Sequence, residues 1–536
     1  MSTSLDALLE KFGGKLAGDI SSPGAENTVS ASHTSTARPI TGISLDSKAV
    51  KSGELFAAMP GNRVHGAEFA ESTAAAAILT DAAGAGILAN HHEDRPVWVV
   101  QNLRGVLGFI AAEIYGHPSQ KMQVIGITGT SGKTTTSYIL ESGLRATGSK
   151  VGIIGTTGTR IDGVKVPTSL TTPEAPKLQE LFAMMVGQGV THVVMEVSSH
   201  ALELGRVNGT QFAVAGFSNL SQDHLDFHPT MQDYFRAKAR LFRGELAAHK
   251  AAIVVDEHWG RDMAVIAAET AQECWCVQTN LNGGDSADSG LPSAEVIVDS
   301  ADLAASGNQQ VQLRIAGEKI AFNLPLPGSF NVANAALACA MARLADADLA
   351  AFVRGVENVA VPGRMESLAE GQDFVAVVDY AHKPGALEAV LATLRGQVSG
   401  RVGVVVGCGG DRDSSKRPIM GRIAAQHADY VVVTDDNPRT EDPALIRAAV
   451  MQGAREALHT AGMTSVAAGS ADEAAYLVEE GDRAKAIQLL VDWARAGDAI
   501  VVAGKGHETG QIVGDTVHEF DDRTVLAQAL AGKEAK

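Results

Sequence analysis

The sequence predicts an α/β protein of three domains, in which a central parallel sheet carries a P-loop. Three observations predict this fold class. Short apolar, β-branched runs alternate with Ala-rich helical stretches along most of the chain, which is typical of parallel sheets covered by helices on both faces. The length of 536 residues suits about three domains. A Gly-Lys-Thr string also follows one of the predicted strands directly.

The predicted strands lie in the middle and the C-terminal parts of the chain. Each run is continuously apolar rather than alternating, so we expect both faces of its sheet to be buried. The predicted strands span residues 124–127, 192–197, 213–217, 251–255, 375–378, 402–406, 430–434 and 499–503.

Two clusters of breaker residues divide the chain, one at residues 115–119 and one at residues 360–363. They predict three domains. A polar, Gly- and Asp-rich stretch at residues 279–293 predicts a surface loop inside the central domain. The expected bounds are 1–118 for an N-terminal domain, 119–361 for the central domain and 362–536 for a C-terminal, Rossmann-like domain.

The chain is acidic, with 44 Lys and Arg against 62 Asp and Glu and a net charge of −18. It lacks the basic footprint of a nucleic-acid binder, although a local cationic pocket can still hold a small anion. Four cysteines do not suggest a secreted disulfide scaffold. Asp6 and Glu10 stand where a signal peptide would be basic and then apolar, and no apolar run approaches the roughly 20 residues of a membrane span. We expect a cytoplasmic protein with no membrane partner.

The strongest local signal is the glycine-containing loop after the strand 124–127. Its glycines let backbone N–H groups face phosphate oxygens, and the following helix adds the positive end of its dipole. Lys133 would reach the β- and γ-phosphates, and Thr134 would bind Mg²⁺. Ile127 replaces the usual first glycine, a shortened form that favours an ATPase over the commonest GTPases and kinases. The residues expected to hold ATP are Gly129, Thr130, Ser131, Gly132, Lys133, Thr134 and Thr135.

Polar residues also follow two other strands of the central domain. Glu196 closes the strand 192–197, and a carboxylate at this end of a parallel sheet can coordinate Mg²⁺. Several polar groups between Asn219 and His228 follow the strand 213–217. The stretch 234–242 predicts an amphipathic helix whose Lys238 points back toward the same place.

In this order, these strings resemble the Mur ligases of peptidoglycan synthesis, and more narrowly their tripeptide-forming members. The strings are Gly-Thr-Ser-Gly-Lys-Thr-Thr from Gly129, Glu-Val-Ser-Ser-His from Glu196, Asp-His-Leu-Asp from Asp223 and Tyr-Phe-Arg-Ala-Lys from Tyr234. The resemblance covers nearly the whole chain. It implies an ATP-dependent amide ligase with two Mg²⁺ ions.

The resemblance also implies that CO₂ carbamylates Lys238, and that the carbamate binds the second Mg²⁺ beside His224. This reaction needs a lysine that loses its proton easily, which partial burial and nearby cations favour. The implied catalytic residues are Lys133, Glu196, His224 and Lys238, and the implied metal ligands are Thr134, Glu196, His224 and Lys238.

Further contacts are implied for ATP and for the substrate UDP-N-acetylmuramoyl-L-Ala-D-Glu. Asn331 also has an alternative role, as the cap of the helix that it opens. After His382 the family usually continues Thr-Pro-Asp, whereas this chain has Lys383-Pro-Gly385. The implied ATP contacts are Asn331, Asn334, Arg364, Asp379 and His382, and the implied contacts of the sugar-peptide are Leu45, Ser47, Thr171, Thr172, Ser198 and Arg206.

The C-terminal domain is implied to bind the incoming amino acid. Asp436-Asn-Pro-Arg439 resembles the tetrapeptide of the meso-diaminopimelate-adding enzymes. Arg439 offers a forked cation to the distal carboxylate, and Asp436 and Asn437 suit the distal ammonium. L-Lysine lacks that carboxylate and would leave Arg439 unpaired. The residues implied for meso-diaminopimelate are Arg412, Asp436, Asn437, Arg439, Gly504 and Glu508.

We therefore expect the D-Glu γ-carboxylate to attack ATP and form an acyl phosphate, which the amine of meso-diaminopimelate then attacks. A monomer is expected. Three alternatives stay open. They are the same ligase adding L-lysine, a ligase similar to folylpolyglutamate synthetase, and a P-loop switch that binds nucleotide without chemistry. By resemblance, the N-terminal domain binds the UDP-substrate, because its strings at 45–48 and 53–61 match the UDP-binding region of the family. This domain argues against the folate alternative.

Overall fold

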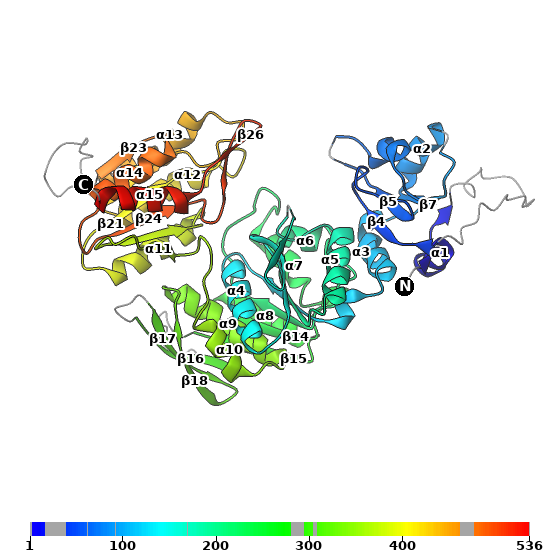
Figure 1. Cartoon of the computed structure of the whole chain (residues 1–536), viewed down its shortest axis with the longest axis horizontal. Helices are drawn as coiled ribbons and strands as arrows, with labels where there is room; N and C mark the ends of the chain where they lie inside the picture. The colour runs from blue at the N-terminus through cyan, green and yellow to red at the C-terminus, as the bar shows by residue number, and fades with distance from the viewer. Residues whose placement is uncertain are drawn as a thin grey trace, which may run out of the picture.

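The computed structural model describes residues 3–16, 39–61, 63–91, 93–168, 170–279, 294–303, 308–460 and 476–534. These residues form three lobes, with the N-terminal and C-terminal lobes on either side of the central one (Figure 1). Each lobe is built on its own principal sheet, and the α/β fold class is confirmed. Of the predicted loop at 279–293, only Thr279 is described, and there the prediction is wrong. Thr279 is buried, and its hydroxyl donates to Asp256 at 2.7 Å.

The N-terminal lobe has a five-stranded sheet in the order β2-β7-β6-β5-β4, parallel from β4 to β7. Helices α1 (Leu5–Phe12) and α3 (Leu103–Ile114) pack on one face, and α2 (Ala82–Asn90) packs on the other with the 3₁₀ turn Gly66–Ser72. The strands are β2 (Lys15–Leu16), β4 (Gly42–Ser44), β5 (Glu54–Ala58), β6 (Ala77–Thr80) and β7 (Val97–Val99), and β1 (Thr3–Ser4) pairs separately with β3 (Pro39–Ile40).

The central lobe has an eleven-stranded mixed sheet in the order β11-β10-β9-β12-β8-β13-β14-β15-β16-β17-β18. The strands from β9 to β16 in this order are parallel, as predicted, and an antiparallel hairpin extends the sheet at each edge. The strands are β8 (Gln123–Thr128), β9 (Val151–Gly155), β10 (Gly158–Ile161), β11 (Val164–Val166), β12 (His192–Glu196), β13 (Val214–Phe217), β14 (Lys250–Val254), β15 (Glu273–Gln278), β16 (Val296–Leu303), β17 (Gln309–Ile315) and β18 (Glu318–Leu324).

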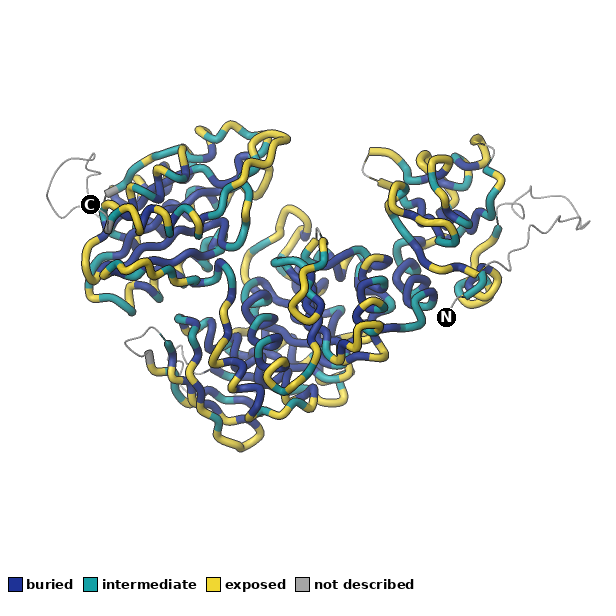
Figure 2. The backbone as a smooth tube through the Cα atoms, viewed as in Figure 1, coloured by how far each residue is buried: buried dark blue, intermediate teal, exposed yellow. Residues whose placement is uncertain are grey.

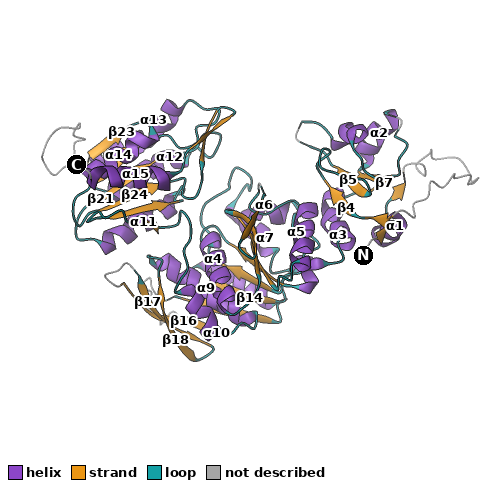
Figure 3. Ribbon diagram, in the orientation of Figure 1, coloured by secondary structure: helices purple, strands orange, loops and turns teal. Residues whose placement is uncertain are grey.

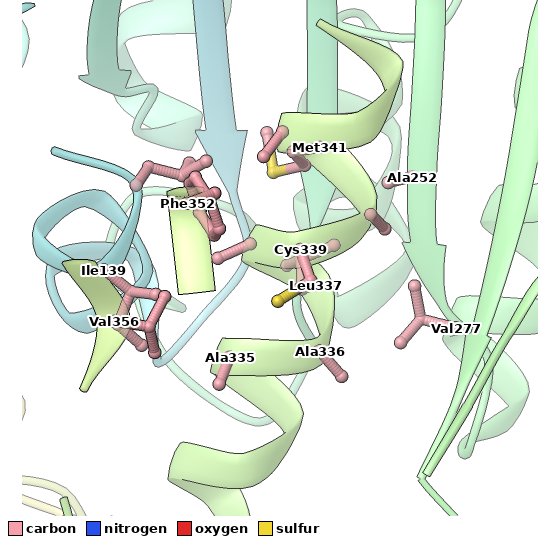
Figure 4. Packing of buried hydrophobic residues seen from close by; sticks show 14 of the residues in the cluster. Ile139, Ala252, Val277, Ala335, Ala336, Leu337, Cys339, Met341, Phe352 and Val356 are labelled. Carbon is pink, nitrogen blue, oxygen red and sulfur yellow. The ribbon is translucent and has the colours of Figure 1, made fainter. Parts of the chain in front are cut away.

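Helices cover both faces of this sheet. The face that carries α9 is packed with small side chains, so α9 lies close to β14 and to α10 (Figure 4). Ala335, Ala336 and Cys339 of α9 are fully buried there beside Phe352. One face carries α4 (Lys133–Ala146), α9 (Ser329–Leu344) and α10 (Leu349–Val356), and the other carries α5 (Ala175–Gly187), α6 (Ser199–Glu203), α7 (Met231–Ala239) and α8 (His258–Ala268). Short 3₁₀ turns lie at Pro118–Lys121 and Gly244–Leu246.

The C-terminal lobe has a six-stranded sheet in the order β19-β20-β24-β21-β22-β23, parallel from β20 to β23. Figure 3 shows its strands between two layers of helices, and Figure 2 shows the buried chain that they enclose. The strands are β19 (Glu366–Ser367), β20 (Val375–Asp379), β21 (Val402–Val406), β22 (Tyr430–Val433), β23 (Tyr476–Glu479) and β24 (Ala499–Ala503), with a separate hairpin of β25 (Gly510–Val513) and β26 (Thr516–Glu519). One face carries α11 (Pro384–Gln397), α12 (Lys416–His427) and α13 (Pro443–Thr460), and the other carries α14 (Arg483–Trp493) and α15 (Asp522–Glu534).

All eight strands predicted from the sequence are present, with bounds that agree within one residue at each end. None of the helices in the described part of the chain has both the length and the apolar character needed to cross a bilayer. The carboxyl ends of β8, β12 and β13 meet at one edge of the central sheet, and the predicted catalytic residues follow these ends.

Candidate active site

The loop between β8 and α4 has the conformation that a phosphate site needs. Gly129 and Gly132 adopt φ angles of 148° and 87°, which L side chains rarely adopt. A Cβ on Gly132 would lie 2.2 Å from the Oδ1 atom of Asn334. Asn334 of α9 therefore lies directly against the loop, where the sequence predicts an ATP contact.

The segment after β13 holds this loop in place. The Ser131 N–H donates to the Asn219 side chain at 3.0 Å, and the Ser218 hydroxyl donates to the Ser131 carbonyl at 2.6 Å. The backbone N–H of Thr130 donates to the Asn219 carbonyl at 2.9 Å. The sequence marked this segment only as polar, since nothing local shows that it reaches a loop about ninety residues earlier.

Lys133 folds back onto the loop from the first residue of α4. Its ammonium donates to the carbonyls of Gly129 at 2.9 Å and Thr130 at 3.0 Å. Burial, and then the neighbouring ammonium of Lys383, lower the pKa of Lys133 to about 8. A phosphate group at the loop would offer this cation a stronger acceptor than the two carbonyls.

Thr134 and Glu196 form a buried pair at the start of α4. The Thr134 hydroxyl donates to Glu196 at 2.9 Å, and Thr156 donates to the same carboxylate through its N–H and its hydroxyl, both at 2.9 Å. Glu196 is only 1% exposed. The two predicted Mg²⁺ ligands thus lie together, and their oxygen donors suit this hard cation.

Among the described residues, no three His, Cys, Asp or Glu side chains gather as a metal cluster. Mg²⁺ commonly takes one or two protein carboxylates and completes its shell with phosphates and waters. The Thr134–Glu196 pair beside a phosphate loop fits that mode of binding. It does not fit a cage made of protein ligands alone.

Lys238 is buried on α7, 1% exposed, beside the loop. Its Nζ atom donates to the Gly129 carbonyl at 2.7 Å and lies 4.4 Å from the centre of the Tyr234 ring. Burial first, and then the positive charges of Lys133 and Lys383, hold the pKa of Lys238 well below its usual value. The helix therefore aims this amine at the site, as predicted, in surroundings that favour its neutral, nucleophilic form.

His224 lies in the loop after β13, with its ring centre 6.0 Å from that of Tyr234, the ring that Lys238 also contacts. Its φ angle is 54°, and burial lowers its pKa to about 4, which favours the neutral imidazole that binds metals. Asp223 lies 3.2 Å from His224 and 2.5 Å from Lys383 of the C-terminal lobe. The sequence analysis did not select Asp223 or Lys383 as site residues.

Arg364 also reaches the loop from the C-terminal lobe. Its guanidinium lies 3.5 Å from the Thr134 hydroxyl and stacks over the Tyr380 ring at 4.5 Å. Asp379 instead accepts the N–H groups of Met365 and Ala381, both at 2.7 Å, and burial raises its pKa.

His382 contacts the Tyr380 carbonyl at 2.8 Å, and burial lowers the pKa of this histidine to about 3. In the structure, Asp379 and His382 thus support the backbone at the end of β20. Their roles as nucleotide contacts stay predictions.

Asn331 does not cap its helix, so that alternative is wrong. The cap of α9 is Gly328, and the Asn331 amide donates to the Pro327 carbonyl at 2.7 Å. Asn334 donates to the Asn331 oxygen at 3.2 Å, which links Asn331 to the phosphate loop through one intermediate side chain. The loop residue Thr135 is likewise buried, inside the first turn of α4.

The residues predicted for the sugar-peptide lie in two lobes. Thr172 donates to the Glu196 carbonyl at 2.9 Å, which places the 171–172 segment beside the Thr134–Glu196 pair. Thr171 contacts Thr156 at 3.3 Å, and Ser198 caps α6. Arg206 pairs with Glu174 at 2.8 Å. Leu45 and Ser47 follow β4 in the N-terminal lobe.

In the C-terminal lobe, Asp436, Asn437 and Glu508 surround a lysine that the sequence analysis did not select. Lys505 is 0% exposed and donates to Asn437 at 2.9 Å, to the Gly510 carbonyl at 2.7 Å and to Asp436 at 3.4 Å. Glu508 lies 3.6 Å from the same ammonium and accepts the Asn437 amide at 2.9 Å. The side chains of Asp436 and Asn437 therefore already have hydrogen-bond partners within the protein.

Arg439 has a φ angle of 51° and donates to the Gly410 carbonyl at 2.7 Å. Gly504 adopts a φ angle of 118°, and its N–H donates to the Asp379 carbonyl at 3.0 Å. Arg412 is exposed between β21 and α12. The ends of β20, β21, β22 and β24 therefore present these residues along one edge of the C-terminal sheet.

Three family models match the chain. They are the Mur ligase family catalytic domain over residues 39–115, the Mur ligase middle domain over 127–342, and the Mur ligase glutamate ligase domain over 363–506. Together they cover all three lobes, and the loop with Lys133, Glu196 and Lys238 falls in the middle one.

Among curated relatives, the UDP-N-acetylmuramoyl-L-alanyl-D-glutamate–2,6-diaminopimelate ligase of Corynebacterium glutamicum is 54% identical over 510 residues, which cover 94% of each chain. The ligase of the same name from Streptomyces coelicolor is 45% identical and covers 92% of each chain. A solved structure of an enzyme with this name matches over 100% of both chains, with 30% identity and a TM-score of 0.64. A folylpolyglutamate synthase from Mycobacterium tuberculosis, solved with ADP and AMPPCP, shares the fold at 19% identity, with a TM-score of 0.56 over 79% of this chain and 93% of its own.

Proposed function

Because this chain belongs to the Mur ligase family, we infer that it is an ATP-dependent ligase that joins 2,6-diaminopimelate to UDP-N-acetylmuramoyl-L-alanyl-D-glutamate. One observation of the site carries the chemistry. Lys133 and Lys238 both donate to the Gly129 carbonyl of the phosphate loop, and the Thr134–Glu196 pair lies at the start of the helix that follows this loop. This grouping supports phosphoryl transfer to a carboxylate.

In the first step, the D-Glu γ-carboxylate attacks the γ-phosphorus of ATP, and ADP leaves. Lys133 stabilises the charge that develops on the phosphate oxygens, and the loop N–H groups bind the β-phosphate. Thr134 and Glu196 would hold Mg²⁺, which supplies further neutralisation of the triphosphate when bound. The product of this step is an acyl phosphate.

In the second step, the free amine of the diamino acid attacks the acyl carbon. The amide bond forms, phosphate leaves, and the ammonium that results loses a proton. Arg439 is the cation proposed for the distal carboxylate of meso-diaminopimelate, and Glu508 is the carboxylate proposed for its distal ammonium. Since Asp436 and Asn437 bind Lys505, we assign them to positioning Glu508 rather than to direct contact.

Lys238 is proposed to react with CO₂. The neutral amine adds to the carbon of CO₂, a proton leaves, and the side chain becomes a carbamate anion. Its burial beside Lys133 supports this step, because these surroundings favour the neutral amine that reacts, and the carbamate anion that forms would be attracted to the Lys133 ammonium. The new oxygens and His224 would provide ligands for a second Mg²⁺.

The relatives named above do not favour the other candidate functions. Addition of L-lysine would leave Arg439 without a carboxylate partner. The folylpolyglutamate synthase shares the fold alone. A P-loop switch that only binds nucleotide would not require a buried lysine such as Lys238 beside the loop. Cytoplasmic location and a monomeric state stay predictions.

Release of ADP and phosphate tests the proposal. We expect release only when ATP, the UDP-dipeptide and meso-diaminopimelate are all present, with L-lysine a much poorer substrate. Hydroxylamine should trap the acyl phosphate when the diamino acid is omitted. Nucleotide binding without substrate-dependent release of ADP would instead support the switch.

Arg439→Ala should raise the KM for meso-diaminopimelate by about 10- to 100-fold, because it removes a charge-assisted bidentate contact. The KM for ATP should stay within about threefold of wild type, since the contacts described for the Arg439 guanidinium are to Gly410 and Asn437 of its own lobe. Arg455→Ala, an exposed arginine on α13 of the same lobe, is the matched control. An unchanged KM for the diamino acid would contradict the assignment of Arg439.

A further inference from the structure

Lys383 is a cation of the C-terminal lobe that enters the nucleotide site of the central lobe. It lies at the N-terminus of α11, and its Nζ atom lies 2.5 Å from the Asp223 carboxylate. The same atom donates to the Thr130 carbonyl of the phosphate loop at 3.4 Å. Its side chain is 16% exposed, so both contacts are made in a largely enclosed place.

Two ammonium groups therefore meet at one carbonyl. Lys133 donates to Thr130 at 3.0 Å from the central lobe, and Lys383 approaches the same oxygen from the C-terminal lobe. Arg364 adds a third cation 3.5 Å from Thr134. Like charges at such separations repel one another unless an anion lies among them.

Among these contacts, Asp223 alone gives Lys383 a negative partner. A triphosphate bound by the loop would place several charged oxygens between Lys133 and Lys383. A bound polyphosphate would therefore offset the repulsion among these cations.

We propose that Lys383 is a catalytic residue that contacts the γ-phosphate of ATP, and that Asp223 holds it beside the loop when no nucleotide is bound. During transfer, the γ-phosphoryl group moves from the β-phosphate oxygen to the carboxylate oxygen, and Lys383 donates hydrogen bonds to its equatorial oxygens without giving up a proton. Because Lys383 belongs to the C-terminal lobe, the phosphate site is complete only when that lobe docks. The inference rests on the proposed ligase function.

A comparison of two nucleotides tests this inference. Calorimetry with Mg²⁺ would measure the Kd of the full-length protein for ADP and for a non-hydrolysable ATP analogue. Lys383→Met should weaken binding of the analogue by about 10- to 100-fold, the range of one charge-assisted hydrogen bond, and binding of ADP by less than about threefold. Lys383→Arg should restore most of the loss. Lys485→Met, which removes a 71% exposed lysine from the same lobe, should leave both affinities unchanged.

Equal weakening of ADP and analogue by Lys383→Met, or no weakening of either, would overturn the assignment. Asp223→Asn separates a phosphate contact from a simple brace between lobes. A brace predicts that Asp223→Asn and Lys383→Met weaken both nucleotides alike, whereas a phosphate contact predicts that Asp223→Asn keeps the preference for the analogue over ADP. None of these measurements needs the UDP-dipeptide or the diamino acid. A failure of the ligase function would therefore appear as absent ADP release, while the result for Lys383 would still stand.

Discussion

Lys238 and Lys505 are two lysines that the fold buries almost completely, but their surroundings are opposite. Lys238 in the central lobe is 1% exposed, and the acceptor described for its ammonium is one carbonyl, that of Gly129. Its charged neighbours are chiefly Lys133 and Lys383. Lys505 in the C-terminal lobe is 0% exposed and lies among Asp436, Asn437 and Glu508.

Burial alone therefore does not decide what a lysine does. A buried ammonium without a carboxylate partner gives up its proton readily and becomes a nucleophile, which suits a reaction with CO₂. A buried ammonium among carboxylates pairs with them and fixes them in place. The first arrangement prepares a group for chemistry, and the second holds a binding pocket together.

Lys505→Met should have the largest effect on stability. It would leave Asp436 and Glu508 close together without their shared cation, and breaking a buried ion pair from one side costs about 3–5 kcal/mol. We expect the unfolding transition of the C-terminal lobe in urea to move to a clearly lower concentration. Lys505→Arg keeps the charge and should recover part of the loss. If Lys505→Met unfolded at an unchanged urea concentration, Lys505 would not be a stabilising cation, and the proposed difference between the two lysines would be wrong.

Lys238→Met should show the reverse pattern. It removes an amine whose charged form is penalised by burial and by two neighbouring cations, so the free energy of unfolding should stay equal or increase. Ligase turnover should nevertheless fall by about 100-fold or more, because the proposed carbamate is lost beside the developing phosphate charge. Turnover and chemical denaturation on the same samples check both halves.

Bicarbonate provides the control for Lys238. Wild-type turnover should decrease in buffer depleted of CO₂ and recover when bicarbonate is added, whereas Lys238→Met should respond to neither change. Recovery of the variant with bicarbonate would show that the carbamate forms elsewhere. A loss of stability as large as that of Lys505→Met would show that Lys238 is a structural cation.

The same contrast explains what could be predicted from the sequence. The phosphate loop could be predicted because its strand, glycines and helix are contiguous, so Gly129 to Thr135 reveal their conformation locally. Lys238 was identified because it follows the loop in a characteristic helical string, and the structure places its amine at Gly129 as expected. Strands were predicted well where both faces are buried, since their continuous apolar runs are easily distinguished from the helical stretches between them.

Contacts between distant segments could not be predicted in this way. Lys505 stands in a glycine-rich string that suggests a turn, and its burial depends on Asp436 and Asn437, nearly seventy residues earlier. The pair of Lys383 with Asp223 joins two lobes. The antiparallel hairpin of β17 and β18 alternates buried and exposed residues, so it lacks the apolar runs by which the parallel strands were recognised.

His507 offers the smallest test, because its charged neighbours, like those of Lys238, are chiefly cations, here Arg364 and Arg523. Burial and the nearby Arg364 lower the pKa of His507 to about 4, although the Thr156 backbone accepts a hydrogen bond from the ring. In the unfolded chain the ring would bind a proton near its ordinary pKa of about 6.5. Between these two values the unfolded state binds more protons than the folded state. His507 therefore contributes no pH-dependent loss of stability above about pH 6.5, and stability decreases as the pH falls toward 4.

His507→Gln keeps a neutral donor for the Thr156 carbonyl and removes the titration. Between pH 7 and pH 5, the free energy of unfolding of the variant should decrease by about 1 kcal/mol less than that of wild type. This figure allows for solvent screening of a partly exposed ring. Urea unfolding of both proteins at the two pH values measures this difference, with His518→Gln, an exposed histidine on β26, as control. Parallel pH profiles for wild type and His507→Gln would mean that the ring stays unprotonated in both states or is solvated in the folded one. The contrast between partnered and unpartnered buried groups would then be limited to the lysines.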